Sequence, residues 1–301
     1  MIKSVVMTHT TITPELPISE AGRLLMIDEL ETIQGFWEAC RESADITAVH
    51  ETRKAIRRTF TLFKLFAPYF APEDLRRSRS GLRRIMRRLA PCRDIAVFRS
   101  KLAACNEAAE RPLNKLAIYW ARRQEKADDR LRHFFARKSA TRIISRYAAL
   151  LAAPGDSAAL ALVGQQQVAH ALPGLVFERI GRVRAWGEIR LTATPRQFHQ
   201  LRIQFKELRY TLTFFEEVLR PDAAEFIDLS RRIQDHLGDL NDASVAVDLL
   251  RDMKKHRGEA GIYRAHQQTE LARLTTEFQP LYAEFDQPAM RRSLAVALAN
   301  L

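Results

Sequence analysis

Five residues between positions 50 and 58 have the types and the spacing of a site that holds an anion. They fall on one side of an α-helix at 100° per residue, and they are His50, Arg53, Lys54, Arg57 and Arg58. Only Glu51 is available in this stretch to offset the cations. Like charges three or four residues apart cost a helix about 0.2–0.5 kcal/mol per pair. We interpret the face as one kept for an anionic ligand, with an ordinary solvated charged face as the alternative.

The same pattern occurs again from Phe198 onward. At a shift of 149 residues, the positions His50, Arg53, Arg57 and Thr61 are matched by His199, Arg202, Lys206 and Tyr210. A second pair of blocks follows in the same order, LAPCRDIAV from Leu89 and LGDLNDASV from Leu237. Two matched blocks in one order indicate an internal duplication.

Arginine and histidine in such an array suit a ligand with repeated phosphate groups. The planar guanidinium bridges phosphate oxygens with two hydrogen bonds, whereas lysine acts as a point charge. A histidine ring donates an N–H, and its protonation is favoured beside phosphate. Tyr210 and Thr61 occupy equivalent places in the two copies and would each add a hydroxyl.

Simpler structural roles exist for several of these residues. His50 and His199 stand near predicted helix starts and could donate structural hydrogen bonds, and Tyr210 could pack inside a bundle. Asp94 and Asp242 could cap helices or hold a neighbouring basic side chain. A metal site is disfavoured, because neither histidine has a His or Cys three or four residues away and the neighbours are cations.

Composition agrees with an affinity for polyanions. The 301 residues include 48 Lys and Arg against 36 Asp and Glu, a formal charge of +12. Fifteen of these cations lie between Arg53 and Lys101, against only Glu73, Asp74 and Asp94. Such a balance predicts attraction to nucleic acid, polyphosphate or an acidic surface. A hydrophobic content of 47% is that of a globular chain rather than a disordered basic tail.

The three cysteines, Cys40, Cys92 and Cys105, show no C-x-x-C spacing. We therefore expect no disulfide framework and no thiolate zinc site, which fits a reducing compartment. The first residues lack the apolar core of a signal peptide, and no stretch has the 18 apolar residues of a membrane span. We expect a cytoplasmic protein that does not enter a membrane.

Apolar periodicity predicts an all-α chain without a sheet. Residues 1–18 form an irregular segment, 19–153 a first helical half and 154–301 a second, with the boundary at Pro154-Gly155-Asp156. The first half is predicted to hold helices at 19–41, 46–67, 72–89, 95–109, 113–135 and 138–152. The second is predicted to hold helices at 157–171, 174–191, 195–221, 223–237, 241–256, 259–284 and 287–300. Thr194-Pro195-Arg196-Gln197 has the pattern of a capping box.

Four motifs in order resemble the CHAD domain, the conserved histidine α-helical domain. They are H-x-x-R-K-x-x-R-R from His50, L-A-P-C-R-D from Leu89, H-x-x-R-x-x-x-K-x-x-R-Y from His199 and Q-x-x-L-G-x-x-N-D from Gln234. The resemblance covers the chain from about Ser19 onward. It implies two helical bundles related by a pseudo-twofold axis, with basic faces around a central groove that binds inorganic polyphosphate. It also implies a cytoplasmic location that includes polyphosphate granules.

Carried over by position, the resemblance implies a site of sixteen residues. In the first half it points to His50, Arg53, Lys54, Arg57, Arg58, Arg83, Arg84, Arg87 and Arg88. In the second half it points to His199, Arg202, Lys206, Arg209, Tyr210, Arg231 and Arg232. Three positions depart from the pattern. Ala90 replaces a glycine, so the expected turn there should differ, and Ile203 and Glu207 stand where the first copy has Lys54 and Arg58. The groove should therefore be lopsided, with more anion contacts in the first half.

We expect a binding protein and not an enzyme. The sequence lacks the phosphate-cradling G-x-x-x-x-G-K-[ST] loop and the E-x-E-x-K signature of the triphosphate tunnel enzymes. No cofactor is expected. A nucleic-acid-binding protein is the main alternative, but it would need aromatic side chains among the cations to stack bases, and only Tyr210 shares a basic face. A scaffold that docks an acidic protein or a granule surface is a further alternative, and the oligomeric state is left open.

Overall fold

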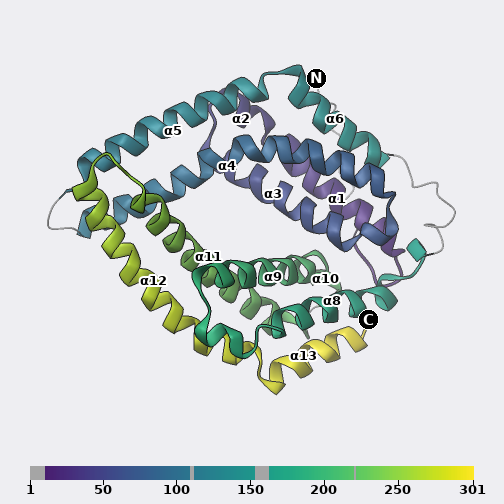
Figure 1. Cartoon of the computed structure of the whole chain (residues 1–301). Coiled ribbons are helices and arrows are strands. Elements are labelled where there is room, and N and C mark those ends of the chain that lie inside the picture. The colour runs from purple at the N-terminus through teal and green to yellow at the C-terminus, as the bar shows by residue number, and fades with distance from the viewer. Residues whose placement is uncertain (1–10, 109–111, 153–162, 220–221) are drawn as a thin grey trace. The chain divides into compact units, whose positions relative to one another are not determined.

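The computed structural model describes residues 11–108, 112–152, 163–219 and 222–301, and its secondary structure there is helical (Figure 1). The chain forms two compact units. Unit 1 contains residues 1–97 and 120–168, and unit 2 contains residues 98–119 and 169–301. The all-α prediction is confirmed for the described residues, where an isolated bridge between Pro17 and Gln167 is the only β-type pairing. The predicted boundary at 154–156 lies outside the described residues.

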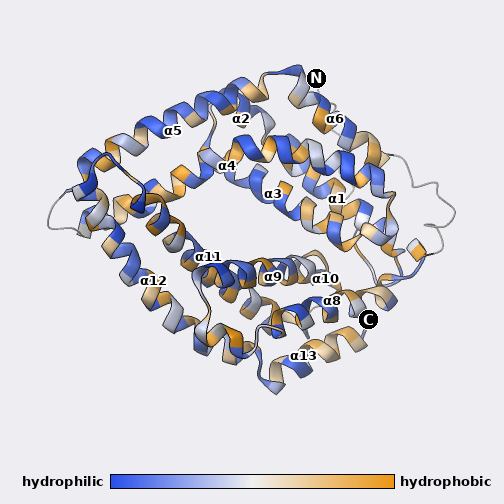
Figure 2. Cartoon of the chain, in the orientation of Figure 1, coloured by the Kyte–Doolittle hydropathy of each residue, from blue (hydrophilic) through white to orange (hydrophobic). Residues whose placement is uncertain are grey.

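Unit 1 is built on α1 (Ile18–Gly35) packed along α3 (Ile46–Leu65), with α2 (Trp37–Glu42) between them in the chain. The helices α1 and α3 approach closely at Gly22, where a β-carbon would lie 2.5 Å from the Phe66 ring. Helix α6 (Lys138–Ala152) covers α1, and its Tyr147 is fully buried against Phe63 of α3. Most helices carry both hydrophilic and hydrophobic residues along their length, as one-sided burial requires (Figure 2).

The first half of α4 (Pro72–Ala108) and the second half of α5 (Asn114–Phe135) complete unit 1. The remaining parts of these two helices belong to unit 2, which we did not expect from the sequence. Helix α4 packs closely on α6 at Gly81, where a β-carbon would lie 2.8 Å from Ile143. A short 3-10 helix, η1 (Ala67–Tyr69), joins α3 to α4.

Unit 2 is also built of helices. It contains α8 (Val168–Arg184), the 3-10 helix η2 (Glu188–Thr192), α9 (Pro195–Phe214), α10 (Glu216–Leu219), α11 (Ala224–Arg251), α12 (Arg257–Phe285) and α13 (Pro288–Ala299). Helix α11 packs along both α9 and α12. Phe205, Tyr282 and Phe285 form an aromatic cluster, with ring centroids 5.1–6.2 Å apart. Such pairs add about 0.5–1.5 kcal/mol each beyond the burial of their area.

Several predicted helix boundaries were wrong in the same direction. The predicted breaks near 90 and 238 do not occur, because α4 continues through Pro91 and α11 continues through Gly238. Helix α8 likewise continues through Pro173, where two helices were expected. An interior proline costs a helix about 3 kcal/mol, but Pro91 is exposed and its neighbours Leu89 and Cys92 are buried. Burial of the apolar stripe on both sides of the proline offsets this loss.

Other boundaries were wrong because the chain breaks where a single helix was expected. Residues 19–41 form two helices, since α1 ends at Gly35 and the following break places Trp37 in the core, 4.4 Å from the Phe135 ring. Helix α9 ends at Phe214 rather than near 221. Residues 157–162 of a further predicted helix lie outside the described part of the chain. No described helix is long and apolar enough to cross a membrane.

Candidate functional site

Helix α3 positions the first group of predicted cations. Its first turn is capped by Asp45, whose carboxylate accepts a hydrogen bond of 2.8 Å from the backbone N–H of Ala48. The residues Val49, Ile56 and Phe63 are buried and hold one face of the helix against the core. The opposite side therefore carries His50, Arg53, Lys54 and Arg57 outward or partly outward.

Arg53 is the cation of this face that lies deepest. Its side chain is only 15% exposed, and Nη2 lies 2.8 Å from a carboxylate oxygen of Asp94 on α4. Burial and, next, the nearby Arg57 and Arg93 lower the pKa of Arg53 to about 10, and Asp94 opposes them. The guanidinium remains charged at neutral pH. Its Nε atom is buried and has no hydrogen-bond partner among the described residues.

His50 and Lys54 share the only acidic residue of this helix face. The Nζ of Lys54 lies 2.5 Å from Glu51, and the Nε2 of His50 lies 3.8 Å from the same carboxylate. The pKa of His50 is lowered, chiefly by burial and next by Arg93. Burial and Arg93 thus favour the neutral ring in the free protein, and a nearby anion would favour the charged one.

Two contacts fix how α3 lies against α4. Arg53 meets Asp94, and the guanidinium of Arg79 lies 6.0 Å from the ring centroid of Phe60. Between these contacts, α3 carries Arg57 and α4 carries Arg83 on the same side as Arg79. Arg87 and Arg93 flank that side. Within the described chain, no carboxylate forms an ion pair with four of these residues: Arg57, Arg83, Arg87 and Arg93. We call His50, Arg53, Arg57, Arg83, Arg87 and Arg93 the α3–α4 cationic face.

Four of the predicted site residues in unit 1 do not belong to this face, and the first of them is Lys54, which is paired with Glu51. Arg58 forms an ion pair with Glu29 of α1, whose side chain is 7% exposed, so Arg58 stabilises the bundle. Arg84 and Arg88 lie on another flank of α4, where the guanidinium of Arg88 stands 5.8 Å from the ring centroid of Phe134 on α5. Arg93 belongs to the face but was missing from the predicted site, although it stands in the repeated L-A-P-C-R-D block.

In unit 2, helix α9 begins as predicted. The side chain of Thr194 accepts from the backbone N–H of Gln197, and the side chain of Gln197 accepts from the backbone N–H of Thr194, which is a complete capping box with Pro195 at the first position. One turn later, the Nδ1 of His199 lies 2.6 Å from the Oδ1 of Asn241 on α11. The structural role considered for this histidine is therefore real, and its Nε2 remains on the exposed side.

Most other predicted cations of unit 2 are engaged inside the unit. Arg209 donates to the side-chain oxygen of Gln234 and lies 4.9 Å from the Tyr210 ring centroid. Arg231 pairs with Asp228, at 2.6 Å, and with Glu216. Arg232 pairs with Glu284 of α12. Arg202 and Lys206 are half-buried.

The two hydroxyls expected on the basic faces are buried. Tyr210 is 4% exposed and packs near Phe214. Thr61 is 4% exposed, and its hydroxyl donates to the backbone oxygen of Arg57 at 3.3 Å. The expectation of an exposed hydroxyl in each copy was therefore wrong. Each of the two residues lies four positions after a cation of the basic face, yet its side chain points into the core. The spacing along a single helix did not reveal this.

Asp94 and Asp242 hold basic side chains and do not cap helices, since both lie inside long helices. Asp94 pairs with Arg53, as described above. Lys101 of α4 lies 3.0 Å from Asp239 and 3.6 Å from Asp242, both on α11. The sequence allowed each aspartate either to cap a helix or to hold a basic side chain, and both are observed to hold a basic side chain.

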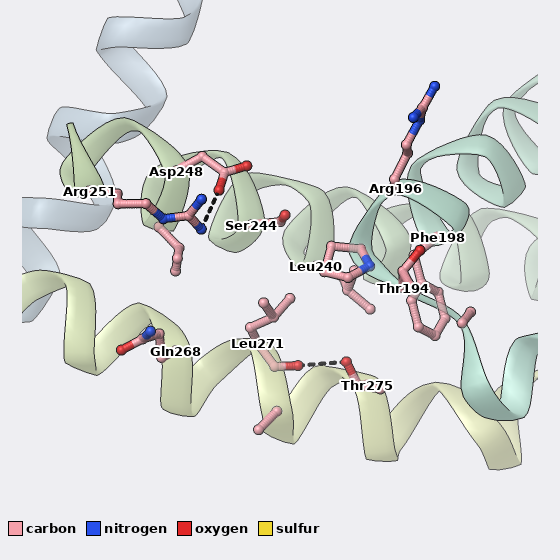
Figure 3. A pocket seen from close by; sticks show the side chains of 14 residues that line it. Thr194, Arg196, Phe198, Leu240, Ser244, Asp248, Arg251, Gln268, Leu271 and Thr275 are labelled. Carbon is pink, nitrogen blue, oxygen red and sulfur yellow. Dashed lines mark hydrogen bonds and ion pairs between the residues drawn. The ribbon is translucent and has the colours of Figure 1, made fainter.

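A pocket of about 690 Å³ lies elsewhere in unit 2, under the first turn of α9 and between α11 and α12 (Figure 3). Its floor includes Phe198, Leu240 and Leu271, and the Arg251 guanidinium at its side is paired with Asp248 at 2.8 Å. It contains none of the predicted site residues. Among the described residues, we also find no group of three His, Cys, Asp or Glu side chains placed to hold a metal ion.

The fold and the cationic helices together define an all-α protein of two helical units. In one unit, α3 and α4 carry several arginines that have no carboxylate partner in the described chain. Comparison with known proteins agrees with this class. The model of the CHAD domain family matches residues 25–251, and the chain belongs to this family. No curated protein matches the sequence.

Two solved structures share the fold. The CHAD domain from the plant Ricinus communis is 19% identical, with a TM-score of 0.72 over 97% of this chain and 95% of that one. PptA from Streptomyces chartreusis is 13% identical, with a TM-score of 0.68 over 89% of this chain and all of the other.

Proposed function

We propose that this protein binds inorganic polyphosphate through the α3–α4 cationic face and catalyses no reaction. The observation that carries the proposal is that Arg57, Arg83, Arg87 and Arg93 gather on two packed helices without a carboxylate partner in the described chain. Arginines that serve only solubility are usually interspersed with acids. Here the repulsion among them would be relieved by a ligand that brings several negative charges.

Polyphosphate matches this face better than nucleic acid does. A polyphosphate chain has repeating anions and no bases, so it needs only cations spaced along a surface. Binding of a single nucleic-acid strand also uses aromatic side chains as stacking platforms. Phe60, the aromatic residue beside Arg57 and Arg83, is half-buried under Arg79, and Tyr210 is buried. The family resemblance noted above points to the same ligand.

The non-catalytic part of the proposal rests on the sequence. Phosphoryl transfer needs a group that stabilises the charge of the transferred phosphate and one that orients the nucleophile. The α3–α4 cationic face could supply the first. For the second, its acidic neighbours are Glu51 and Asp94, and both are already paired with cations. Incubation with polyphosphate should leave the chain-length distribution unchanged.

The test is direct binding of polyphosphate by isothermal titration calorimetry at 0.15 M salt, with the variant Arg57→Glu plus Arg83→Glu. A hydrogen bond to a charged group contributes about 1.5–3 kcal/mol, so loss of two such contacts should weaken binding at least about tenfold. The matched control is Arg142→Glu plus Arg146→Glu, which makes the same charge change at exposed positions of α6. The control should stay within about twofold of the original affinity, since exposed charges are screened beyond about 8 Å.

Competition separates the two polyanions. Polyphosphate should displace bound RNA at a much lower phosphate concentration than RNA needs to displace polyphosphate. Equal loss of binding in both double variants would contradict the proposed face, and stronger binding of RNA would favour the nucleic-acid alternative. Circular dichroism should show unchanged helix content in each variant.

A further inference from the structure

Unit 2 has lost the basic residue, or has only a histidine, at five of the positions that make unit 1 cationic. We compare the two units position by position. Helix α3 is aligned with α9 at the shift of 149 residues, and α4 is aligned with α11 at the shift of 148 that the LAPCRDIAV and LGDLNDASV blocks define. In this order, Lys54, Arg58, Arg87, Arg88 and Arg93 correspond to Ile203, Glu207, Asp235, His236 and Asn241. His236 is also engaged, because its Nε2 lies 2.7 Å from the backbone oxygen of Leu274.

Where unit 2 keeps an arginine on α11, that arginine is neutralised. Arg231 and Arg232 correspond to Arg83 and Arg84, which have no ion-pair partner in the described chain. Arg231 is held by Asp228 and Glu216 and Arg232 by Glu284, in contacts of 2.6 Å or less. A phosphate would have to displace these carboxylates, which are attached to the same unit and so compete at high effective concentration.

The exposed stripe of α11 is acidic as well. Asp228, Asp235, Asp239 and Asp242 fall on one side of this helix at intervals of seven, four and three residues. Lys101 is already paired with the last two of them. The stretch from Arg202 to Leu250 contains 6 Lys and Arg against 10 Asp and Glu, the reverse of the balance between Arg53 and Lys101. An approaching phosphate chain meets repulsion along this helix.

We infer that the polyphosphate footprint is confined to unit 1, so that a short oligophosphate fills the site and additional phosphates add no contacts on unit 2. This inference rests on the proposed function and specifies its ligand. The face extends from Arg83 to Arg93 on α4, which is about 15 Å along the helix. It offers six basic side chains, from His50 to Arg93. Unit 2 retains His199, Arg202 and Lys206 from the same sequence pattern, but it lacks the additional unpaired arginines that surround the corresponding residues of unit 1.

A series of ligands of increasing length tests the inference. Affinity would be measured for tripolyphosphate, a linear chain of roughly ten phosphates and one of roughly a hundred, each at several salt concentrations. Affinity should rise from the first to the second. From the second to the third ligand, affinity should rise only by a statistical factor, because a longer chain offers more overlapping stretches that can occupy the same site. The slope of log affinity against log salt should stay at about −4 for both long ligands, from about −0.7 per neutralised phosphate. A slope on the longest chain about twice that on the ten-phosphate chain would overturn the inference.

Matched variants at corresponding positions of the two units give the second readout. Arg57→Glu plus Arg83→Glu should weaken binding at least about tenfold, whereas Lys206→Glu plus Arg231→Glu should change it less than about threefold at 0.15 M salt. If the unit 2 variant weakens binding as much as the unit 1 variant, the footprint extends over both units and the inference is wrong. If neither ligand length binds to the original protein at all, the proposed function itself fails.

A neutral variant covers the case in which the unit 2 reversal unfolds the chain. Glu216→Gln, Asp228→Asn and Glu284→Gln together remove the carboxylates that hold Arg231 and Arg232. Release of these arginines should steepen the salt slope for the longest chain by about 1 and leave the affinity for tripolyphosphate within about twofold. An unchanged slope would mean that these carboxylates are not what prevents unit 2 from binding phosphate, and it would contradict the inference.

Discussion

The hydrogen bond between His199 and Asn241 determines what that histidine can offer to an anion. Because Asn241 Oδ1 accepts, the proton of a neutral ring lies on Nδ1, and the exposed Nε2 presents a lone pair. A lone pair repels a phosphate oxygen, so this ring becomes a donor to phosphate only in its protonated form. His50 has no such side-chain partner on α4 in the described chain, and the charges around it decide its state.

We predict that polyphosphate binding takes up a proton at His50. The pKa of His50 is lowered by burial and by Arg93, with smaller effects in the same direction from Lys54 and Arg53, and Glu51 opposes them. A bound phosphate would cancel much of the repulsion and raise the pKa. Affinity should therefore increase as the pH falls from 8 to 5.5, by up to about tenfold for each pKa unit that binding adds.

The measurement is affinity against pH with a long chain, whose internal phosphates stay ionised throughout this range. His50→Gln should flatten the part of the profile that belongs to His50, and calorimetry in buffers of different ionisation enthalpy should count fewer protons taken up. A profile that is identical in the variant would show that His50 does not contact the ligand or respond to it.

At the scale of elements, the ion pair between α1 and α3 can be compared with the charges at the corresponding positions of unit 2. Glu29 on α1 pairs with Arg58 on α3, and burial is the main cause that raises the pKa of Glu29. Glu29 corresponds to Arg179 on α8 at a shift of 150 residues, and Arg58 corresponds to Glu207 on α9 at the shift of 149. Arg179 and Glu207 are both about 95% buried. Arg179 pairs with Glu178 at 2.7 Å, and Glu207 has Arg182 of α8 at 4.0 Å. The acid thus lies on the first helix and the base on the second in unit 1 (α1 and α3), whereas the bases lie on α8 and the acid on α9 in unit 2.

This comparison predicts the result of a charge swap in unit 1. Glu29→Arg or Arg58→Glu alone leaves two like charges in a mostly buried site and should reduce the free energy of unfolding by about 3–5 kcal/mol. The double variant restores opposite charges and should recover at least half of that loss. Urea denaturation of the four proteins gives the coupling energy from a double-mutant cycle. If the double variant is only as stable as the sum of the two single losses predicts, surrounding groups fix which helix carries the acid and which the base.

The sequence was sufficient to predict the helical class, most of the helices and the capping box at Thr194. The errors came from prolines and glycines. Pro91, Pro173 and Gly238 are read locally as helix ends, but burial of apolar residues on both sides of each outweighs the local cost. At the site, the sequence identified the α3 cations from their spacing. It could not show that Arg58 and Arg231 are taken by Glu29 and Glu216, because those partners are 29 and 15 residues away and their contact depends on how helices pack.

At the scale of the whole molecule, the positive charge is unequally divided. Unit 1 contains 25 Lys and Arg against 16 Asp and Glu, and unit 2 contains 23 against 20. The excess of the whole chain thus comes mainly from unit 1, where several arginines of α3 and α4 repel one another. In the absence of ligand, this repulsion lowers stability.

We predict that salt stabilises the free protein. Raising NaCl from low concentration to roughly 0.3 M shortens the Debye length and should raise the melting temperature by about 2–4 °C, the equivalent of about 1 kcal/mol. Arg57→Gln plus Arg83→Gln should melt higher than the original protein at low salt and gain less from added salt. A melting temperature that falls with salt would mean that attractive pairs, such as Arg53 with Asp94, dominate the electrostatics of unit 1.

The reversed placement of acid and base on α1 and α3 and on α8 and α9 also affects how a chain with two similar units finds its own fold. Two related halves present similar helices, and a nascent α1 could dock on α9 in place of α3. Such an exchange would bring Glu29 against Glu207 and leave Arg58 to meet Arg179, with like charges buried at both seams. Each half thereby rejects the helices of its twin, and the chain avoids a domain-swapped product that matching polarities would have allowed.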